Sequence, residues 1–271
     1  MAEASQASAT GLRVARGADG IAVITIDRPQ VHNALDWATM DAFAAAVREL
    51  GAELAADAGR DDGLRAVVVA GGGTRAFCAG GDQRALAGYE SAADGERLAD
   101  VMTEALAGLE ALPVPVIAAI NGYALGGGAE IALACDLRVV DAEVRFGLVQ
   151  LRLGLTPGWG AGQRLLRLVG YGKALELFLA GERLGAAQLV ALGLAAEAAP
   201  AGQALDAAMA WAARIAAADP DTVRAVKALL RAGVERPPAE AAAIERALFA
   251  SSWAGEAHLA ALRGFAEEPA R

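Results

Sequence analysis

The chain is poor in the residues that most often bind metal ions or form disulfides. Its 271 residues include two histidines and two cysteines, and its acidic, cysteine and histidine residues do not cluster at metal-ligand spacing. Both cysteines, Cys78 and Cys135, lie in apolar segments, where small buried side chains are expected. A metal site is therefore not expected, and the low cysteine content favours a reduced, cytoplasmic location.

Basic blocks, long apolar runs and nucleotide-binding loops are also missing. Lys173 and Lys227 are the only lysines, and the formal net charge is −9, which argues against a nucleic-acid partner. No apolar run approaches the roughly 18 residues of a membrane span, and no secretory signal is visible at the start. Neither a P-loop motif nor a dinucleotide-binding glycine motif is present, so no nucleotide or membrane partner is expected.

Glycine, in contrast, is abundant and clustered. The segment from Asn121 to Asp136 places three consecutive glycines, residues 126–128, between a strand-like run and a helix-like run, and Glu130 follows. A glycine turn lets backbone N–H groups approach a ligand, and the start of a helix adds positive potential. N–H donors beside a carboxylate are suited to stabilising an enolate or oxyanion while a proton moves.

A second glycine turn lies upstream. The β-branched run from Val67 to Ala70 predicts a buried strand, and the sequence Ala79-Gly80-Gly81-Asp82 predicts a turn into a short helix capped by Asp82. Gly81 thus offers a further N–H before a helix. Together the two turns predict an oxyanion hole in which each turn donates one hydrogen bond to the same oxygen.

Strands and helices alternate over most of the chain, which predicts an α/β architecture. Strands are expected at 12–16, 21–27, 67–70, 114–120 and 137–140, and helices from the cap Asp36 onward, at 96–112 and at 130–135. From about Gln203 the chain becomes alanine-rich and helical, with helices expected at 207–218, 220–232, 238–251 and 255–266. We therefore divide it into a core, 1–200, and a C-terminal helical region, 201–271.

Five ordered segments over roughly residues 10–200 resemble the crotonase (enoyl-CoA hydratase/isomerase) superfamily. They are ITIDRPQVHNALDWATMDAF, VVVAGGGTRAFCAGGD, VPVIAAINGYALGGGAEIALACDLRVV, VRFGLVQLRLGLTPGWGAGQRLLRLVG and ALELFLAGERLGAAQLVALGLAAEAAP. The resemblance implies a spiral of ββα units with a helical C-terminal region and an acyl-CoA site in the core. It also implies a homotrimer or dimer of trimers, and no cofactor other than the coenzyme A carried by the substrate.

The resemblance also implies roles for individual residues. Gly81 and Gly127 would donate their N–H groups to the thioester carbonyl, and Glu130 would be the principal acid–base residue. Trp159 would form a wall of the acyl pocket, and Arg84 would contact a coenzyme A phosphate. The substrate-binding residues expected on this basis are Ala34, Ala79, Asp82, Arg84, Gly126, Gly158 and Trp159.

The chain departs from the family pattern at Gln150. Members with two catalytic carboxylates carry a second glutamate twenty residues after the first, and here that position is Gln150. A glutamine can orient water but cannot exchange a proton at neutral pH. Loss of one general acid–base group typically lowers a rate by about 100- to 10,000-fold. Gln150 therefore leaves open which reaction the chain catalyses.

Several activities remain open at this point. The first is an enoyl-CoA hydratase or isomerase in which Glu130 moves the proton and Gln150 holds a water. The second is a decarboxylase of a malonyl-type (methylmalonyl or ethylmalonyl) thioester, because residues 155–160, LTPGWG, are similar to decarboxylating relatives. Residues 80–83, GGDQ, also resemble the dihydroxynaphthoyl-CoA synthase branch. A further alternative, from another class, is a catalytically silent coenzyme A-binding or scaffold subunit, and retention of the donor glycines and Glu130 argues against it. Our best single prediction is the hydratase/isomerase.

Overall fold

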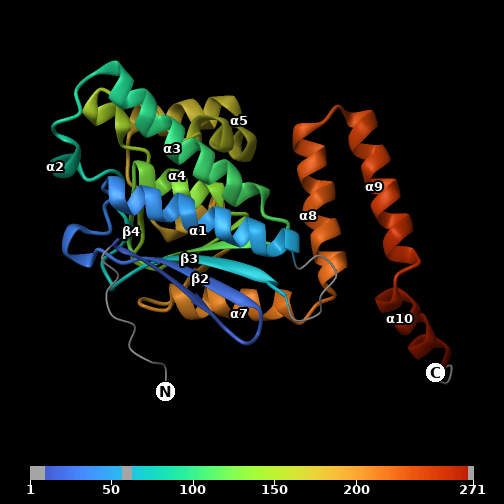
Figure 1. The fold of residues 1–271 in the computed structure, drawn as a ribbon. Helices are drawn as coiled ribbons and strands as arrows, with labels where there is room; N and C mark the ends of the chain where they lie inside the picture. The colour runs from blue at the N-terminus through green and yellow to red at the C-terminus, as the bar shows by residue number, and fades with distance from the viewer. Residues whose placement is uncertain (1–9, 57–62, 268–271) are drawn as a thin grey trace.

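The computed structural model describes residues 10–56 and 63–267, which form two sheets and the helices around them (Figure 1). The larger sheet has six strands in the order β1-β2-β3-β5-β7-β9. Its first pair is antiparallel and the other pairs are parallel. The strands are β1 (Leu12–Arg16), β2 (Ile21–Ile26), β3 (Ala66–Gly71), β5 (Val116–Ile120), β7 (Leu137–Asp141) and β9 (Glu197–Ala199).

The smaller sheet consists of three short parallel strands. In the order of the sheet they are β4 (Ala76–Cys78), β6 (Tyr123–Leu125) and β8 (Arg145–Gly147). Each follows one strand of the larger sheet, so the pairs β3/β4, β5/β6 and β7/β8 repeat the same path. The chain therefore advances by one strand in both sheets at each repeat, which gives a spiral of strand pairs.

Helices bury both faces of the larger sheet. On one face α1 (Trp37–Ala56), α3 (Ala92–Ala111) and α4 (Gly127–Ala134) share the main apolar cluster with side chains such as Val67 and Val69. On the other face α7 (Ala204–Ala216) packs against Val68 and its neighbours (Figure 1). Burial on both faces explains why β3 is a continuous apolar run and does not alternate with polar residues.

Two helices begin earlier than predicted. The helix predicted at 96–112 begins earlier, at Ala92, because Ser91 and Asp94 form a reciprocal capping box. The helix predicted at 130–135 begins at Gly127, so two of the three glycines lie in its first turn. The predicted Asp36 cap is confirmed, since Asp36 Oδ1 accepts a hydrogen bond of 2.9 Å from Thr39 N.

Several elements had no counterpart among the predicted ones. They are β6, β8, β9, the short helix α6 (Ala186–Ala191), the 3-10 helices η1 (Pro29–Val31) and η2 (Gln150–Leu153), and α5 (Ala161–Ala180). The short helix predicted after the Gly81 turn is confirmed as α2 (Gln83–Leu86). Within α5 the backbone leaves the helical region at Gly170, where φ is 75° and ψ is 166°. A positive φ of this kind favours glycine.

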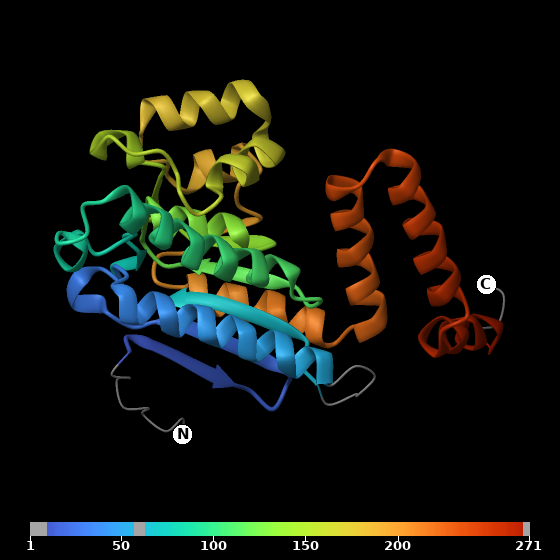
Figure 2. The same ribbon diagram turned by 45° about the horizontal axis from the view of Figure 1, so that its top comes forward.

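The last three helices extend away from the sheets (Figure 2). They are α8 (Pro220–Glu235), α9 (Pro238–Trp253) and α10 (Glu256–Glu267). Lys227 attaches α8 to the core, because its Nζ donates to Asp136 Oδ2 at 2.6 Å and to the Val114 carbonyl at 2.9 Å. In contrast, α7 is part of the packing on the larger sheet, and the division of the chain at residue 200 stays a prediction.

Membrane insertion through a helix is not supported. Within residues 10–56 and 63–267, each helix is either too short or too polar to span a bilayer.

Candidate active site

The two glycine turns predicted to cooperate lie against each other. They follow β4 and β6, which are adjacent parallel strands and therefore about 4.8 Å apart. A Cβ atom on Gly80 would lie 3.1 Å from Gly127 N, and one on Gly128 would lie 1.9 Å from the Cys78 carbonyl oxygen. Only residues without side chains permit this approach of one turn to the other.

The backbone N–H groups of Gly81 and Gly127 have no acceptor within residues 10–56 and 63–267. Gly127 is the first residue of α4 and has no acceptor in a preceding turn. Gly81 forms an isolated β-bridge with Leu35, but this bridge does not use the Gly81 N–H group. Its two hydrogen bonds, each 2.8 Å long, are donated by Leu35 N to the Gly80 carbonyl and by Asp82 N to the Leu35 carbonyl. Within the described residues neither N–H donates a hydrogen bond. Two free donors at neighbouring strand ends can bind one oxygen.

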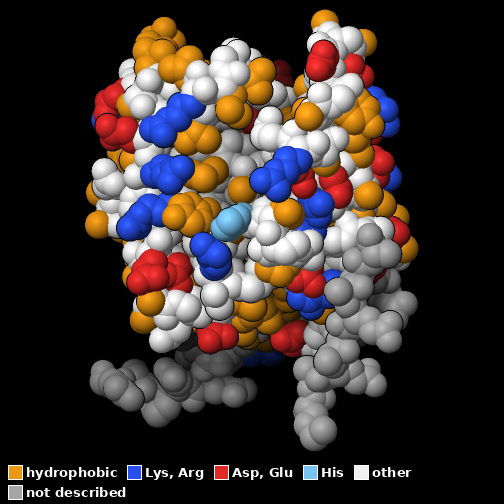
Figure 3. Space-filling view, turned by 90° about the vertical axis from the view of Figure 1, so that its left-hand side faces the viewer, with side chains coloured by type: hydrophobic (Ala, Val, Ile, Leu, Met, Phe, Trp, Pro, Cys, Tyr) orange, Lys and Arg blue, Asp and Glu red, His pale blue; other side chains and the backbone are white. Residues whose placement is uncertain are grey.

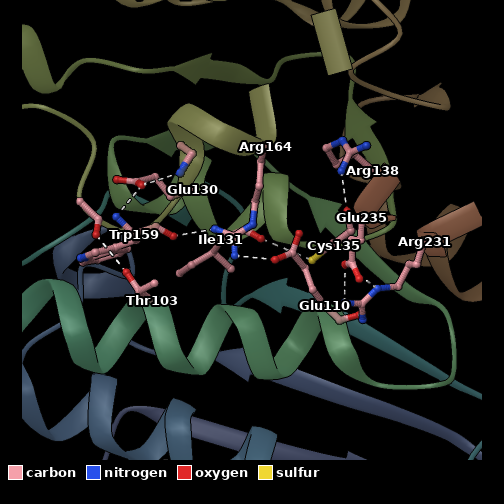
Figure 4. A network of polar contacts seen from close by, with 12 residues as sticks. Thr103, Glu110, Glu130, Ile131, Cys135, Arg138, Trp159, Arg164, Arg231 and Glu235 are labelled. Atoms are coloured by element: carbon pink, nitrogen blue, oxygen red, sulfur yellow. Dashed lines mark hydrogen bonds and ion pairs between the residues drawn. The ribbon is translucent and has the colours of Figure 1, made fainter. Parts of the chain in front are cut away.

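Glu130 lies behind these turns, on α4, with only 2% of its surface exposed. Its Oε2 accepts a hydrogen bond of 2.8 Å from the backbone N–H group of Trp159 (Figure 4). The same oxygen accepts one of 3.1 Å from Ala161 N, and Oε1 accepts one of 2.9 Å from Gln150 Nε2. Burial raises the pKa of the Glu130 carboxyl, and these hydrogen bonds act in the opposite direction. A buried carboxyl with a raised pKa is suited to proton transfer near neutral pH.

Gln150 begins η2, directly beyond β8, and is 7% exposed. Its Nε2 is committed to Glu130, whereas its Oε1 is buried and has no hydrogen-bond partner within the described residues. An unpaired buried acceptor costs about 1–3 kcal/mol. Gln150 Oε1 is thus an acceptor beside Glu130 that a water or a substrate hydroxyl would satisfy.

Trp159 closes this region from the side of α5. A Cβ atom on Gly127 would lie 2.0 Å from Trp159 Cζ3, so the indole ring rests on the Gly127 Cα. The preceding residue is fixed as well, because the Gly158 carbonyl accepts a hydrogen bond from Thr103 Oγ1 at 3.1 Å. The predicted role of Trp159 as a wall of the acyl pocket stays a prediction, but its ring lies beside one of the two donors.

Several known proteins with similar sequences and folds are named enoyl-CoA hydratases. Residues 16–270 match the family model described as enoyl-CoA hydratase/isomerase. The short-chain-enoyl-CoA hydratase of Clostridium acetobutylicum is 32% identical over 248 residues, which cover 92% of each chain. The crystal structure of an enoyl-CoA hydratase from Bacillus anthracis superposes with a TM-score of 0.86 at 30% identity, covering 95% of this chain and 96% of that one.

The chain belongs to the enoyl-CoA hydratase/isomerase family. This confirms the predicted crotonase fold class and the predicted hydratase/isomerase type of enzyme, which acts on acyl-CoA thioesters. A further relative, the fatty acid oxidation complex subunit alpha of Shewanella loihica, is 42% identical over 173 residues. That match covers 63% of this chain and 23% of that subunit.

Two of the predicted substrate-binding residues, Ala34 and Asp82, are held by Arg28, which was not among the predicted site residues. Its guanidinium donates to the Ala34 carbonyl and to Asp82 Oδ2 (3.2 Å) and pairs with Asp36 Oδ2 (2.8 Å). Asp82 also caps α2, as predicted. Arg28 therefore fastens the segment before α1 to the turn that contains Gly81. No local pattern signals this, because Asp82 is 54 residues away.

Three more predicted residues lie around the same strand ends. Ala79 N donates to the His32 carbonyl at 3.1 Å. Gly126 adopts a positive φ of 53°, and its N–H donates to the Gly147 carbonyl at 2.9 Å, which joins the ends of β6 and β8. Arg84 is exposed on α2, and within the described residues its side chain is not joined to the other predicted residues.

Basic side chains gather near the opposite, amino ends of the small sheet. Arg183 lies over the ring of Tyr123, 5.7 Å from its centroid, and the His32 ring is 6.3 Å from the same ring. Arg75 directly precedes β4, and Arg145 begins β8 beside Tyr123. Figure 3 shows Lys and Arg side chains around a histidine on one face of the molecule. We refer to Arg75, Arg145 and Arg183 as the arginine patch.

Proposed function

We propose that this family member hydrates a 2-enoyl-CoA thioester, with Glu130 as the only carboxylate that moves a proton. The observation that carries the proposal is the pair formed by Glu130 and Gln150. Gln150 Nε2 holds Glu130 Oε1, while Gln150 Oε1 remains a free buried acceptor beside it. This arrangement suits a reaction in which a water molecule must be oriented as well as deprotonated.

In the proposed complex the thioester oxygen accepts hydrogen bonds from the N–H groups of Gly81 and Gly127. Both donors are unused, and they lie at the ends of neighbouring strands. They stabilise the negative charge that develops on this oxygen when a nucleophile adds to the β-carbon. Removal of one such donor typically lowers kcat by about 100- to 1,000-fold.

The reacting water donates one hydrogen to the remaining lone pair of Glu130 Oε1 and the other to Gln150 Oε1. A lone pair of this water forms the new C–O bond at the β-carbon, and Glu130 takes the proton that the water loses. The electrons of the double bond move to the thioester, giving an enolate held by Gly81 and Gly127. Glu130 then returns the proton to the α-carbon, so one water is added and the carboxylate is regenerated.

Recognition of the coenzyme A portion is assigned to the arginine patch. Its three guanidinium groups provide local positive charge on a chain whose net charge is −9. Phosphate groups bind well to such groups because the hydrogen bonds are charge-assisted. The proposed reaction needs no cofactor besides the coenzyme A carried by the substrate.

The test is hydration of crotonyl-CoA by the wild-type protein and by Glu130→Gln. We expect loss of the conjugated enoyl absorbance and a product one water heavier, with turnover at least about 100-fold lower in Glu130→Gln. Glu96→Gln, which changes an exposed glutamate on α3, is the matched control. A wild-type product of unchanged mass, a product that has lost carbon dioxide, or full activity in Glu130→Gln would each contradict the proposal.

We also propose that α8–α10 assemble the chain into a homotrimer or a dimer of trimers. Helix α9 has no buried residue, and large apolar side chains are exposed along these helices, including Leu230 (62%), Phe249 (65%) and Trp253 (57%). A groove of about 750 Å³ lies between them and the end of α3. Native mass spectrometry should give trimers or hexamers for the wild type and smaller species for Leu230→Asp/Phe249→Asp. A monomeric wild type would contradict the assembly.

A further inference from the structure

One buried charged residue near the site has no part in the mechanism described above. Arg164 lies in the first turns of α5 and is 6% exposed. Its Nη1 donates to the Trp159 carbonyl at 2.6 Å, and its Nη2 forms an ion pair of 2.7 Å with Glu110 Oε2 of α3 (Figure 4). A buried guanidinium is costly to desolvate unless its geometry is well satisfied, so its position calls for an explanation.

The peptide that Arg164 contacts lies between the two backbone donors of Glu130. Trp159 N and Ala161 N both bind Glu130 Oε2, and the Trp159–Gly160 peptide, whose carbonyl accepts from Arg164, connects them. This peptide joins the two peptides that carry the donor N–H groups, so holding its carbonyl restricts the backbone torsions on both sides of it. A displacement of this peptide would move at least one donor relative to the carboxylate.

Gly160 shows how closely the guanidinium fits this turn. Its φ is +94°, a value that L residues with side chains rarely adopt. A Cβ atom here would lie 2.6 Å from Arg164 Nη1. The turn thus has both the conformation and the space that allow the arginine to reach the Trp159 carbonyl from within its own helix.

We infer that Arg164 is a positioning residue, which holds the Trp159–Gly160 peptide so that the N–H groups of Trp159 and Ala161 point at Glu130. The functional part of this inference rests on the proposed role of Glu130. Arg164 does not touch Glu130 itself, and it acts through the backbone between them.

Glu110 fixes the other side of the guanidinium and is itself held from α8. Arg231 Nη1 donates to the Glu110 backbone carbonyl at 2.6 Å, and Arg231 also pairs with Glu235 at 2.7 Å. Arg164, Glu110, Arg231 and Glu235 therefore form a connected set of charged contacts that runs from α5 through α3 to α8. The pKa of Glu130 responds to burial and to hydrogen bonds from Ala161, Trp159, Gln150 and Gly158. Arg164 reaches this carboxyl only through two of those bonds.

The loss of Arg164 should change the pKa of Glu130 in a direction set by the form of Glu130 that the two N–H groups stabilise. Both donate to the charged carboxylate, so weakening them favours the protonated form and raises the pKa of Glu130. In Arg164→Met we expect the acidic limb of the kcat/KM profile to move to higher pH and kcat to fall about tenfold, with KM little changed. Arg164→Lys keeps the positive charge but lacks the planar guanidinium group with its two donor nitrogens, so it should restore only part of the activity.

The experiment is a titration of the Glu130 carboxyl carbon by NMR in protein labelled with ¹³C-glutamate, with the resonance assigned from its loss in Glu130→Gln. The Glu130 titration should move to higher pH in Arg164→Met and, to a smaller extent, in Glu110→Gln. It should not move in Arg167→Met, which changes an exposed arginine of the same helix. Should Arg164→Met fail to fold, Glu110→Gln provides the decisive comparison.

An unchanged titration in a folded Arg164 or Glu110 variant would overturn the inference, as would an equal shift in Arg167→Met. The titration does not depend on turnover. Full activity in Glu130→Gln would therefore remove the proposed catalytic role while leaving a measured positioning effect of Arg164 intact.

Discussion

The two ends of the small sheet differ in almost every physical respect. At the carboxyl ends the polar groups, Glu130 and Gln150, are buried and held by the backbone or by each other. At the amino ends the arginine patch is exposed around Tyr123. Buried and fixed groups are suited to stabilising a transition state, whereas exposed charges are suited to attracting and holding an anionic substrate. We therefore expect changes at the first end to affect kcat and changes at the second to affect KM.

The largest effect is expected at the carboxyl end, from Gly127→Ala. The added methyl group would overlap the Trp159 ring, which a Cβ atom would approach to 2.0 Å, so the N–H donor and the ring must move apart. We expect kcat for crotonyl-CoA to fall about 100-fold, as for loss of an oxyanion donor, with a smaller change in KM. Gly95→Ala, where the added atom meets open space in α3, is the control. A change in KM without a change in kcat would contradict the expected difference between the two ends of the small sheet.

Gln150→Leu should have the next largest effect. The substitution removes the acceptor for the reacting water and the hydrogen bond to Glu130, so kcat should fall about 10- to 100-fold. Because that hydrogen bond lowers the pKa of Glu130, its loss should also move the acidic limb of the kcat profile to higher pH. Steady-state rates between pH 5 and 9 would measure both effects. Gln163→Leu, on the exposed side of α5, should leave the profile unchanged.

At the amino end, Arg183→Gln should raise KM for crotonyl-CoA about fivefold without changing kcat, since an exposed charge contact contributes roughly 1 kcal/mol. The decisive measurement uses a pantetheine thioester of the same acyl group, which lacks the nucleotide phosphates. The KM for this thioester should be the same in the wild-type protein and in Arg183→Gln. Arg48→Gln, an exposed arginine on α1, is the control. An equal rise in KM for both thioesters would show that the patch does not bind phosphate.

The smallest expected effect is on stability. Burial raises the pKa of Glu130 in the folded state above its value in the unfolded chain. The contribution of protonated Glu130 to stability is therefore fully present below the pKa of the unfolded state, and it is lost as pH rises through the pKa of the folded state. Replacing it by neutral glutamine should therefore raise Tm by no more than a few degrees near pH 8, and the difference should disappear under acidic conditions. Calorimetry of Glu130→Gln against Glu96→Gln from pH 4 to 8 measures this. A lower Tm at pH 8 would contradict it.

The sequence was sufficient for five of the six strands of the larger sheet, all except β9, but not for the smaller sheet. The strand at 67–70 was predicted because residues buried on both faces form a continuous apolar run. Strands β6 and β8 have only three residues each, too few for a periodic pattern, and β8 begins with an exposed arginine. The start of α4 was placed too late, because consecutive glycines are typical of turns and seldom of the first turn of a helix.

The candidate site was predicted in part, because its glycines and its carboxylate are adjacent in sequence to recognisable strands. The spacing from Glu130 to Gln150 identified the missing second carboxylate but not the hydrogen bond between the two side chains. Arg164 was missed because its partner Glu110 is 54 residues away and only the folded chain brings them together. Arg28 was missed for the same reason, since its bond to Asp82 has no local sequence pattern.

The spiral path of the chain has a consequence for how this enzyme could acquire a new reaction. Each successive turn of the spiral ends a small-sheet strand at the same edge, and the residues beyond β4, β6 and β8 are Gly81, Gly127 with Glu130, and Gln150. The first two turns are constrained by backbone contacts that exclude larger residues. The third presents a side chain whose oxygen has no partner within the described residues. Single substitutions are therefore tolerated best at the third turn, where a new side chain can change the chemistry while the two turns proposed to bind the thioester stay intact.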